Sequence, residues 1–148
     1  MKIIKLEYRL SWLHDKNNNE IESIRAKNLK KMHQFKELLI WQKSRSFCSE
    51  IYTITSTFPN DEKFGLTNQL RRASVSIPSN IAEGSSRNSN KDFSRFLEIA
   101  IGSAYEIETQ LLIASDLGFI KIEQLELIIN QLDEIIKMIS KLKSTLKM

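Results

Sequence analysis

The sequence has few of the residues that make tight turns or crosslinks. Its 148 residues include four glycines, two prolines and one cysteine. So few glycines and prolines do not suit the many turns of a β-sandwich or barrel, and they favour long helices. The single Cys48 excludes an internal disulfide, and nothing else in the chain calls for an oxidising compartment.

A long apolar run is also lacking. No stretch approaches the ~20 apolar residues that span a bilayer. The first residues are basic and partly apolar, but Glu7 and Arg9 interrupt the apolar run and no small-residue cleavage site follows. We therefore expect neither a signal peptide nor a membrane partner, and a cytoplasmic location.

The side chains of common catalytic and metal sites are scarce. The two histidines, His14 and His33, both lie outside the region with clear helical periodicity. That leaves the region without a histidine base, a Ser–His or Cys–His pair, or the Glu-x-x-His motif of di-iron bundles. The sequence also lacks a phosphate-binding Gly-x-x-x-x-Gly-Lys-Ser/Thr loop and a paired-cysteine zinc pattern. We expect no enzymatic activity, no cofactor and no metal.

Charge is present but segregated along the chain. Residues 1–32 carry eight basic and four acidic side chains, a net +4, and the 14 basic and 14 acidic side chains of residues 33–148 cancel. Within that neutral part, residues 63–95 hold six basic and two acidic groups (+4), and residues 96–134 hold one basic and eight acidic groups (−7). The net charge of +4 for the whole chain thus overstates the basic character of residues 33–148, which should have a dipolar surface.

Apolar periodicity predicts four helices in residues 33–148. The first runs from about Phe35 to Thr57, and a second begins after a cap at Asn60 or Asp61. A third begins at an N-cap within residues 88–90 and ends near Gly118, which can adopt the left-handed conformation. The fourth is the most regular, with core positions at Leu125, Ile128, Leu132, Ile135, Ile139, Leu142 and Leu146. The fold class is therefore all-α, an up-down-up-down four-helix bundle.

Residues 1–32 are predicted to be a basic, poorly packed extension. The polar stretch "HDKNNNE" at 14–20 makes a continuous helix doubtful. Met32 stands directly before the patterned region, so a natural start at Met32, with 1–31 as an upstream addition, is an alternative. The predicted division is 1–32 and 33–148.

The fourth helix has a wider apolar face than one bundle core needs. Ile122, Ile129 and Ile136 form a second row beside the core positions. A coiled-coil seam requires only a narrow stripe, so a second subunit is predicted to cover the additional row.

The stretch "QLRRASVSIPSNIAEG", residues 69–84, has helical periodicity with a proline inside it. Pro78 removes the hydrogen bond to the carbonyl of Ser74, at a cost of ~3 kcal/mol. Neighbouring serine hydroxyls can satisfy freed backbone groups, so a kinked continuous helix is favoured. In the alternative, Pro78 is the first residue of a new short helix.

The candidate nucleic-acid-binding residues are five cations in and after this stretch: Arg71, Arg72, Arg87, Lys91 and Arg95. Arg71 and Arg72 point about 100° apart on a helix, so only one of them readily shares a flat surface with the other three. Their functional interpretation is a phosphate-binding patch. The alternatives are a solvated face or ion pairs with the acidic stretch 96–134 of another subunit.

Two long motifs resemble a known family. "LTNQLRRASVSIPSNIAEGSSR" and "FSRFLEIAIGSAYEIETQLLIASDLGFI" resemble the small bacterial four-helix-bundle proteins encoded within 23S rRNA intervening sequences, and "FKELLIWQKS" resembles the family's opening. The accessory variability determinant proteins of diversity-generating retroelements are similar. The likeness covers about Phe35 to Leu146.

The resemblance implies a four-helix protomer in a ring-like homopentamer with no established enzymatic activity. Relatives with a known role bind nucleic acid and a partner protein through basic surfaces. The resemblance implies that the five cations named above correspond to those surfaces. This chain departs from them in the neutral charge of residues 33–148. Two functions follow: an oligomeric protein that binds RNA or DNA weakly, or a structural scaffold that binds a protein partner and has no nucleic-acid role.

Overall fold

The computed structural model describes residues 18, 20–23 and 34–146, and the chain divides into two compact units, Met1–Gln34 and Phe35–Met148. The second unit contains four long helices and no strand among its described residues: α2 (Leu39–Thr55), α3 (Leu66–Ser85), α4 (Asn90–Asp116) and α5 (Ile122–Thr145). Two short 3-10 helices, η1 (Gln34–Glu37) and η2 (Asn60–Lys63), precede α2 and α3. Of the predicted extension, only residues 18 and 20–23 are described, and both histidines lie outside the described residues. The predicted boundary between residues 32 and 33 stays a prediction.

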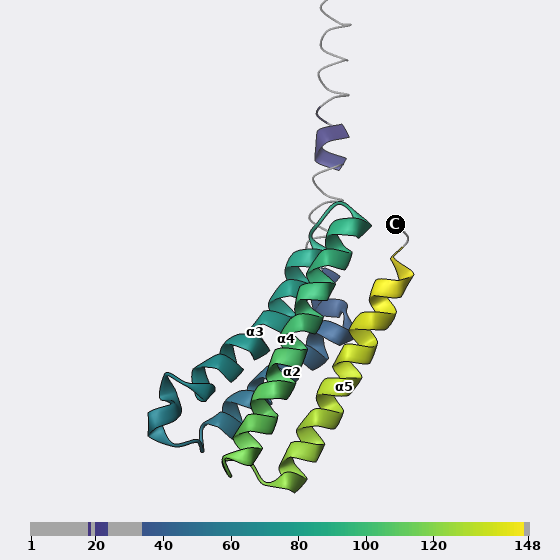
Figure 1. Ribbon diagram of the computed structural model, residues 1–148. Helices are drawn as coiled ribbons and strands as arrows, with labels where there is room; N and C mark the ends of the chain where they lie inside the picture. Colours follow the sequence, from purple (N-terminus) through teal and green to yellow (C-terminus); the bar gives the residue numbers. More distant parts are fainter. Residues whose placement is uncertain (1–17, 19, 24–33, 147–148) are drawn as a thin grey trace, which may run out of the picture. The chain divides into compact units, whose positions relative to one another are not determined.

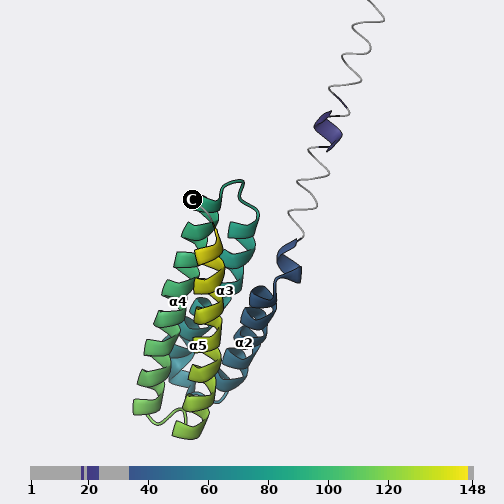
Figure 2. The ribbon, with the colours of Figure 1, turned by 90° about the vertical axis from the view of Figure 1, so that its right-hand side faces the viewer.

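The four helices form a bundle in which consecutive helices pack side by side (Figures 1 and 2). Polar contacts show that the neighbours run antiparallel. Between α3 and α4, Ser103 donates to Ser76 and Gln110 donates to Gln69, so the residue number falls on one helix as it rises on the other. Helix α5 closes the bundle against α2, where Lys43 pairs with Glu134. The predicted all-α helical bundle is confirmed.

The core lies along the centre of the bundle and takes aliphatic side chains from every helix. Its fully buried members include Ile51, Leu70, Ile77, Leu97, Ile107, Leu111, Ile128 and Ile139. Alanines at 100, 104 and 114 on α4 are also completely buried. Small side chains there let neighbouring helices approach α4 closely, and α3 and α4 indeed form the most extensive helix pair.

The first two helices begin later than predicted. Phe35 lies in the separate η1 turn, and Leu38 is extended, so α2 starts only at Leu39. At the start of α3, the N-cap position is Gly65 rather than Asn60 or Asp61, and the side chain that accepts from the first helical N–H, of Leu66, is the Glu62 carboxylate, at 2.8 Å. Local propensity did not distinguish these three polar residues, since all lie in or next to the η2 turn.

Helix α3 runs unbroken through Pro78, which is buried inside it. The continuous helix is thus confirmed, and the alternative of a new helix starting at Pro78 is wrong. The predicted role of the serines differs in detail. Ser74 Oγ donates to the Arg71 carbonyl at 2.8 Å and lies 3.4 Å from Cys48 Sγ, so it joins α3 to α2.

Both ends of α4 follow the predicted chemistry. Ser89 is the N-cap: its hydroxyl accepts from the Asp92 N–H at 3.1 Å and donates to the Asp92 carboxylate at 2.7 Å. At the other end Gly118 adopts φ +75°, with hydrogen bonds from Gly118 N to Ser115 O and from Phe119 N to Ala114 O. This is the Schellman arrangement, which turns the chain directly towards α5.

Helix α5 buries Leu125, Ile128, Leu132, Ile135 and Ile139, as its periodicity predicted, whereas the last two predicted core positions, Leu142 and Leu146, are only partly buried against the core. The additional row divides: Ile129 and Ile136 pack partly against the core, whereas Ile122 is 56% exposed. Within one chain, therefore, the bundle covers most of the wide face by itself. Among the four long helices, α4 has the most exposed large apolar side chains: Ile99, Tyr105, Leu112 and Ile113.

Candidate nucleic-acid interface

The five candidate cations form two separate groups. Arg71 and Arg72 lie in the second turn of α3, whereas Arg87, Lys91 and Arg95 lie at the junction of α3 and α4. Gly84 packs against Phe93 and Phe96, which places the start of α4 beside the end of α3. From Arg72 to Gly84 the helix rises about 18 Å, at 1.5 Å per residue. The structure therefore does not bring the five side chains into one patch.

Arg71 is held in place by α2. Its Nε donates to Thr55 Oγ1 at 2.9 Å, and its guanidinium lies 4.8 Å from the centre of the Tyr52 ring. Thr55 is only 3% exposed and donates its own proton to the Ile51 carbonyl at 2.7 Å. No acidic group in the described part of the chain lies within ion-pair distance of Arg71. The guanidinium is therefore preorganised, and its terminal N–H groups are available to an anion.

Arg72 points to a different side of α3 and is exposed. It borders one hollow with Tyr52, Asn68 and Arg71, and a second hollow with Glu106 of α4. It forms no ion pair with any described residue. The nearby Glu106 lowers the positive potential around Arg72. An anion should therefore bind Arg72 less favourably than it binds Arg71, which lies against α2.

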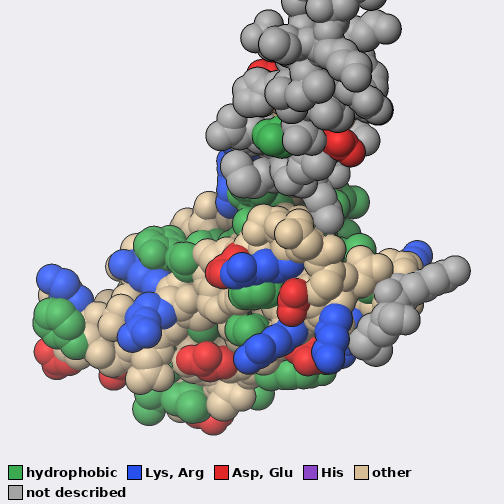
Figure 3. Space-filling model, turned by 90° about the horizontal axis from the view of Figure 1, so that it is seen from above, with side chains coloured by type: hydrophobic (Ala, Val, Ile, Leu, Met, Phe, Trp, Pro, Cys, Tyr) green, Lys and Arg blue, Asp and Glu red, His purple; other side chains and the backbone are tan. Residues whose placement is uncertain are grey.

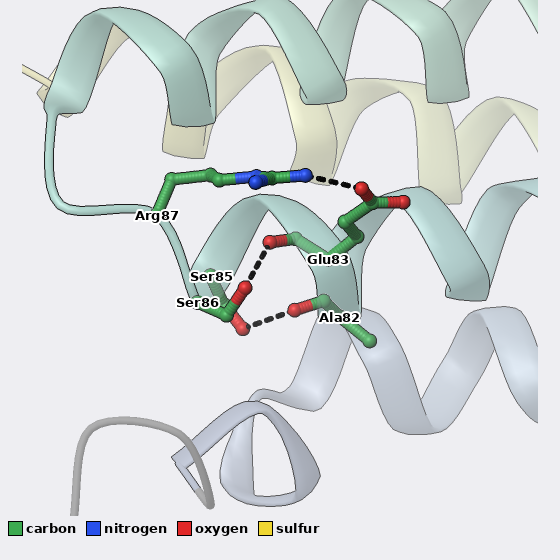
Figure 4. A network of polar contacts seen from close by, with 5 residues as sticks. All are labelled: Ala82, Glu83, Ser85, Ser86 and Arg87. Carbon is green, nitrogen blue, oxygen red and sulfur yellow. Dashed lines mark hydrogen bonds and ion pairs between the residues drawn. The ribbon is translucent and has the colours of Figure 1, made fainter. Parts of the chain in front are cut away.

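Arg87 is largely committed within the chain. Its guanidinium pairs with the Glu83 carboxylate one turn earlier and lies 4.8 Å from the centre of the Phe96 ring. Figure 4 shows Arg87 folded back towards Glu83, with the Ser85 and Ser86 hydroxyls donating to the carbonyls of Ala82 and Glu83. The hydroxyls thus satisfy two carbonyl groups in the last turn of α3, and the ion pair neutralises Arg87, one of the three cations of this group.

Lys91 and Arg95 lie one turn apart on α4, and both are exposed. Neither forms an ion pair within the described residues. Arg95 borders a shallow hollow with Arg87, Asp92, Phe96 and Ile99. The two side chains can contact phosphates, but Asp92 lies beside them and reduces the local charge.

Neighbours of Arg71 complete a surface that the sequence did not reveal. Tyr52 is 44% exposed and Phe64 is 85% exposed, and Lys63 Nζ lies 5.6 Å from the centre of the Phe64 ring. The spacing of Tyr52 and Thr55 places them on one side of α2. Only the packing of α2 against α3 shows that this side meets Arg71.

The charges on the surface are mixed. Figure 3 looks at the molecule from above and shows Lys and Arg side chains interspersed with Asp and Glu side chains on that face. The chain thus lacks, on this face, the continuous basic surface that binds nucleic acid tightly.

Other chemistry has little support in the described part of the chain. No cluster of three or more His, Cys, Asp or Glu side chains there could hold a metal ion, and no helix there is long and apolar enough to cross a membrane. Cys48 is half-buried against Ser74.

The fold and surface define a class: a small all-α four-helix bundle with two groups of cations along α3 and the start of α4, all exposed except the half-buried Arg71. The chain belongs to the 23S rRNA-intervening sequence protein family, whose model matches residues 36–141. This match confirms the resemblance that the sequence motifs suggested.

One solved structure extends the comparison to three dimensions. It is a protein with unknown function from the S23 ribosomal protein family of Bacteroides thetaiotaomicron. The two chains are 31% identical, with a TM-score of 0.68, over 72% of this chain and 96% of the other. Among curated proteins, no sequence matches the chain. Neither the family nor this relative is described by an enzymatic activity.

Proposed function

We propose that the protein is a non-enzymatic homo-oligomer, a pentamer by its family resemblance, that binds RNA or DNA weakly through the cations of α3 and the start of α4. The observation that carries this proposal is the state of Arg71. Its guanidinium is fixed by Thr55 and Tyr52, without an acidic partner among the described residues. A structural arginine in a bundle is normally paired with a carboxylate, whereas one held by a hydroxyl and a ring retains donors for a phosphate.

Weak rather than tight binding follows from the charge balance. Three of the other candidates, Arg72, Lys91 and Arg95, are exposed and form no ion pair with a described residue, but Arg87 is paired with Glu83. With the charges of residues 33–148 summing to zero, few phosphates can be neutralised at once. Affinity and salt dependence should both be modest.

Self-association is supported by the apolar surface of α4. Ile99, Tyr105, Leu112 and Ile113 are 46%, 55%, 47% and 45% exposed. We name these four side chains the α4 apolar face. A second copy suits this face because the chain also provides complementary charge: +4 in residues 63–95 and −7 in residues 96–134. Unlike surfaces of this kind close a ring through heterologous contacts.

The same observations favour a second candidate function, a scaffold that binds a protein partner and no nucleic acid. In that case the cations pair with the acidic stretch of a neighbouring subunit, and the mixed charges on the surface serve assembly alone. High salt should then loosen the oligomer, since exposed ion pairs are screened.

Light scattering of the full chain, with and without a mixed RNA and DNA oligonucleotide at low salt, separates the two functions. An oligomer that gains mass, and loses it steeply as salt rises, supports nucleic-acid binding. Charge reversal of Arg87, Lys91 and Arg95 together, and of Arg71 and Arg72 together, should weaken that binding. An oligomer that ignores the oligonucleotide supports the scaffold, and a monomer contradicts both.

A further inference from the structure

Two aromatic side chains are exposed where α2 passes into α3. Phe64 is 85% exposed and Tyr52 is 44% exposed. A phenylalanine so exposed contributes little to the core, although most large apolar side chains of the bundle are buried. Each ring has a cation beside it: Lys63 Nζ is 5.6 Å from the Phe64 centroid, and the Arg71 guanidinium is 4.8 Å from the Tyr52 centroid.

The two aromatic–cation pairs belong to one continuous surface. One hollow is bordered by both Lys63 and Arg71, together with Ser56, Asn60 and Thr67. The next hollow is bordered by Arg71, Tyr52 and Arg72. Because Arg71 borders both hollows, the surface runs from Lys63 to Arg72 around the turn between α2 and α3, whose two helices are labelled in Figure 1. Phe64 adjoins this surface through its contact with Lys63. We call Tyr52, Lys63, Phe64, Arg71 and Arg72 the corner surface.

This alternation of flat rings and cations fits an unpaired nucleic-acid strand. Bases in a duplex are stacked on one another and hide their faces, whereas an unpaired base can stack on an aromatic ring or on an arginine plane. The cations between the rings are positioned for the phosphates that join successive bases. A purely acidic partner would engage the cations but would leave the Phe64 ring in water.

The second cationic group lacks this alternation. Its aromatic side chain, Phe96, is only partly exposed, and the Arg87 guanidinium lies over the ring. Arg87 itself is paired with Glu83. That group can contribute charge to binding, but its ring is less exposed than Tyr52 and Phe64 are. The cation beside that ring is also neutralised, whereas Arg71 and Lys63 form no ion pair with a described residue.

We propose that the corner surface binds an unpaired segment of RNA or DNA, with bases stacked on Tyr52 and Phe64 and phosphates bound by Arg71 and Arg72. This rests on the proposed nucleic-acid function and adds the form of the nucleic acid and the residues that distinguish it. Thr55 acts as a positioning residue, because it orients the Arg71 guanidinium through Nε.

The test is fluorescence anisotropy of the full chain with a labelled mixed-sequence oligonucleotide of about 12 nucleotides, offered as a single strand and as a duplex. The double variant Tyr52→Leu, Phe64→Leu removes both rings without changing charge. Single-strand affinity should fall about five-fold or more per ring, with the salt slope and duplex binding unchanged. The matched control Tyr52→Phe, Phe64→Tyr keeps both rings and should bind as the unchanged chain does.

The charge variant Arg71→Gln, Arg72→Gln gives the contrasting result. It should weaken binding of the single strand and reduce the salt slope by about 0.7 for each phosphate that is no longer neutralised. If this variant weakens binding and the double leucine variant does not, the corner surface is not a stacking site, although the proposed function stands. If the double leucine variant instead loses oligomer mass, the corner is a subunit contact and the inference is wrong. If the unchanged chain binds neither probe at low salt, the inference and the nucleic-acid function both fall.

Discussion

Gly84 lies where the end of α3 crosses the first turns of α4, and its missing side chain sets how closely the two helices approach. A Cβ at this position would come within 2.7 Å of Phe93 Cδ2 and of Phe96 Cβ. The Phe93 ring can swing away, but Phe96 Cβ is bonded to the α4 backbone, so the helices themselves would have to separate.

We therefore predict that Gly84→Ala destabilises the protein by about 1–2 kcal/mol, because overpacking outweighs the helix-propensity gain of about 1 kcal/mol. Gly102→Ala is the matched control, since a Cβ there meets nothing within 4 Å, and it should stabilise by about 0.5–1 kcal/mol. Urea unfolding at one protein concentration measures both. Equal effects of the same sign would contradict the close-packing explanation.

Glu83 neutralises Arg87, the one candidate cation that forms an ion pair within the part of the chain that the structure describes. Glu83→Gln frees Arg87, so affinity for a single-stranded oligonucleotide should rise by about two-fold to five-fold at low salt, in keeping with the ~0.2–1 kcal/mol of an exposed ion pair. Glu134→Gln is the control. It removes the same charge from the Lys43 pair between α2 and α5. Fluorescence anisotropy measures the affinity of both variants. A similar rise in affinity in both would mean that binding depends only on the net charge of the protein.

At the scale of the element, α4 depends on its cap because the α3–α4 connection is short. The Ser89 hydroxyl satisfies the Asp92 N–H at this end. Ser89→Ala should cost about 1 kcal/mol of unfolding free energy. Ser79→Ala, on the exposed face of α3, should be nearly neutral. Urea unfolding of both variants decides the point, and an unchanged Ser89→Ala would show that the cap is dispensable.

Helix α3 also shows how tertiary packing overrides a local breaker. Pro78 should cost ~3 kcal/mol in a helix interior, yet it is buried inside a continuous helix. Leu70, Ile77 and Ile81 on the same helix are completely buried, and burial of such side chains provides about 1.5–3 kcal/mol each. Packing of the apolar stripe therefore decided between the two interpretations that the proline left open.

At the scale of the whole molecule, the α4 apolar face is the surface proposed for a second copy. Leu112→Asp places a charge on this face and should lower the mass seen by light scattering towards that of one chain. Asn130→Asp, an exposed position on α5, adds the same charge outside the face and should leave the mass unchanged. A Leu112→Asp oligomer of full mass would place the subunit contact elsewhere.

The sequence by itself determined the helical class, the positions of the four helices and most of the core. Scarce glycine and proline exclude a turn-rich fold, and the spacing of apolar residues depends only on the 3.6-residue period of the helix. The cap at Ser89 and the left-handed Gly118 were also predictable, since both depend on backbone chemistry within a few residues.

The tertiary structure alone decided how the candidate site is arranged. It placed the five cations in two groups, paired Arg87 with Glu83, and brought Tyr52 and Thr55 of α2 against Arg71 of α3. The physical reason is that the period of a helix specifies which residues share a face. Which face meets which neighbouring helix depends on the packing of all four helices at once.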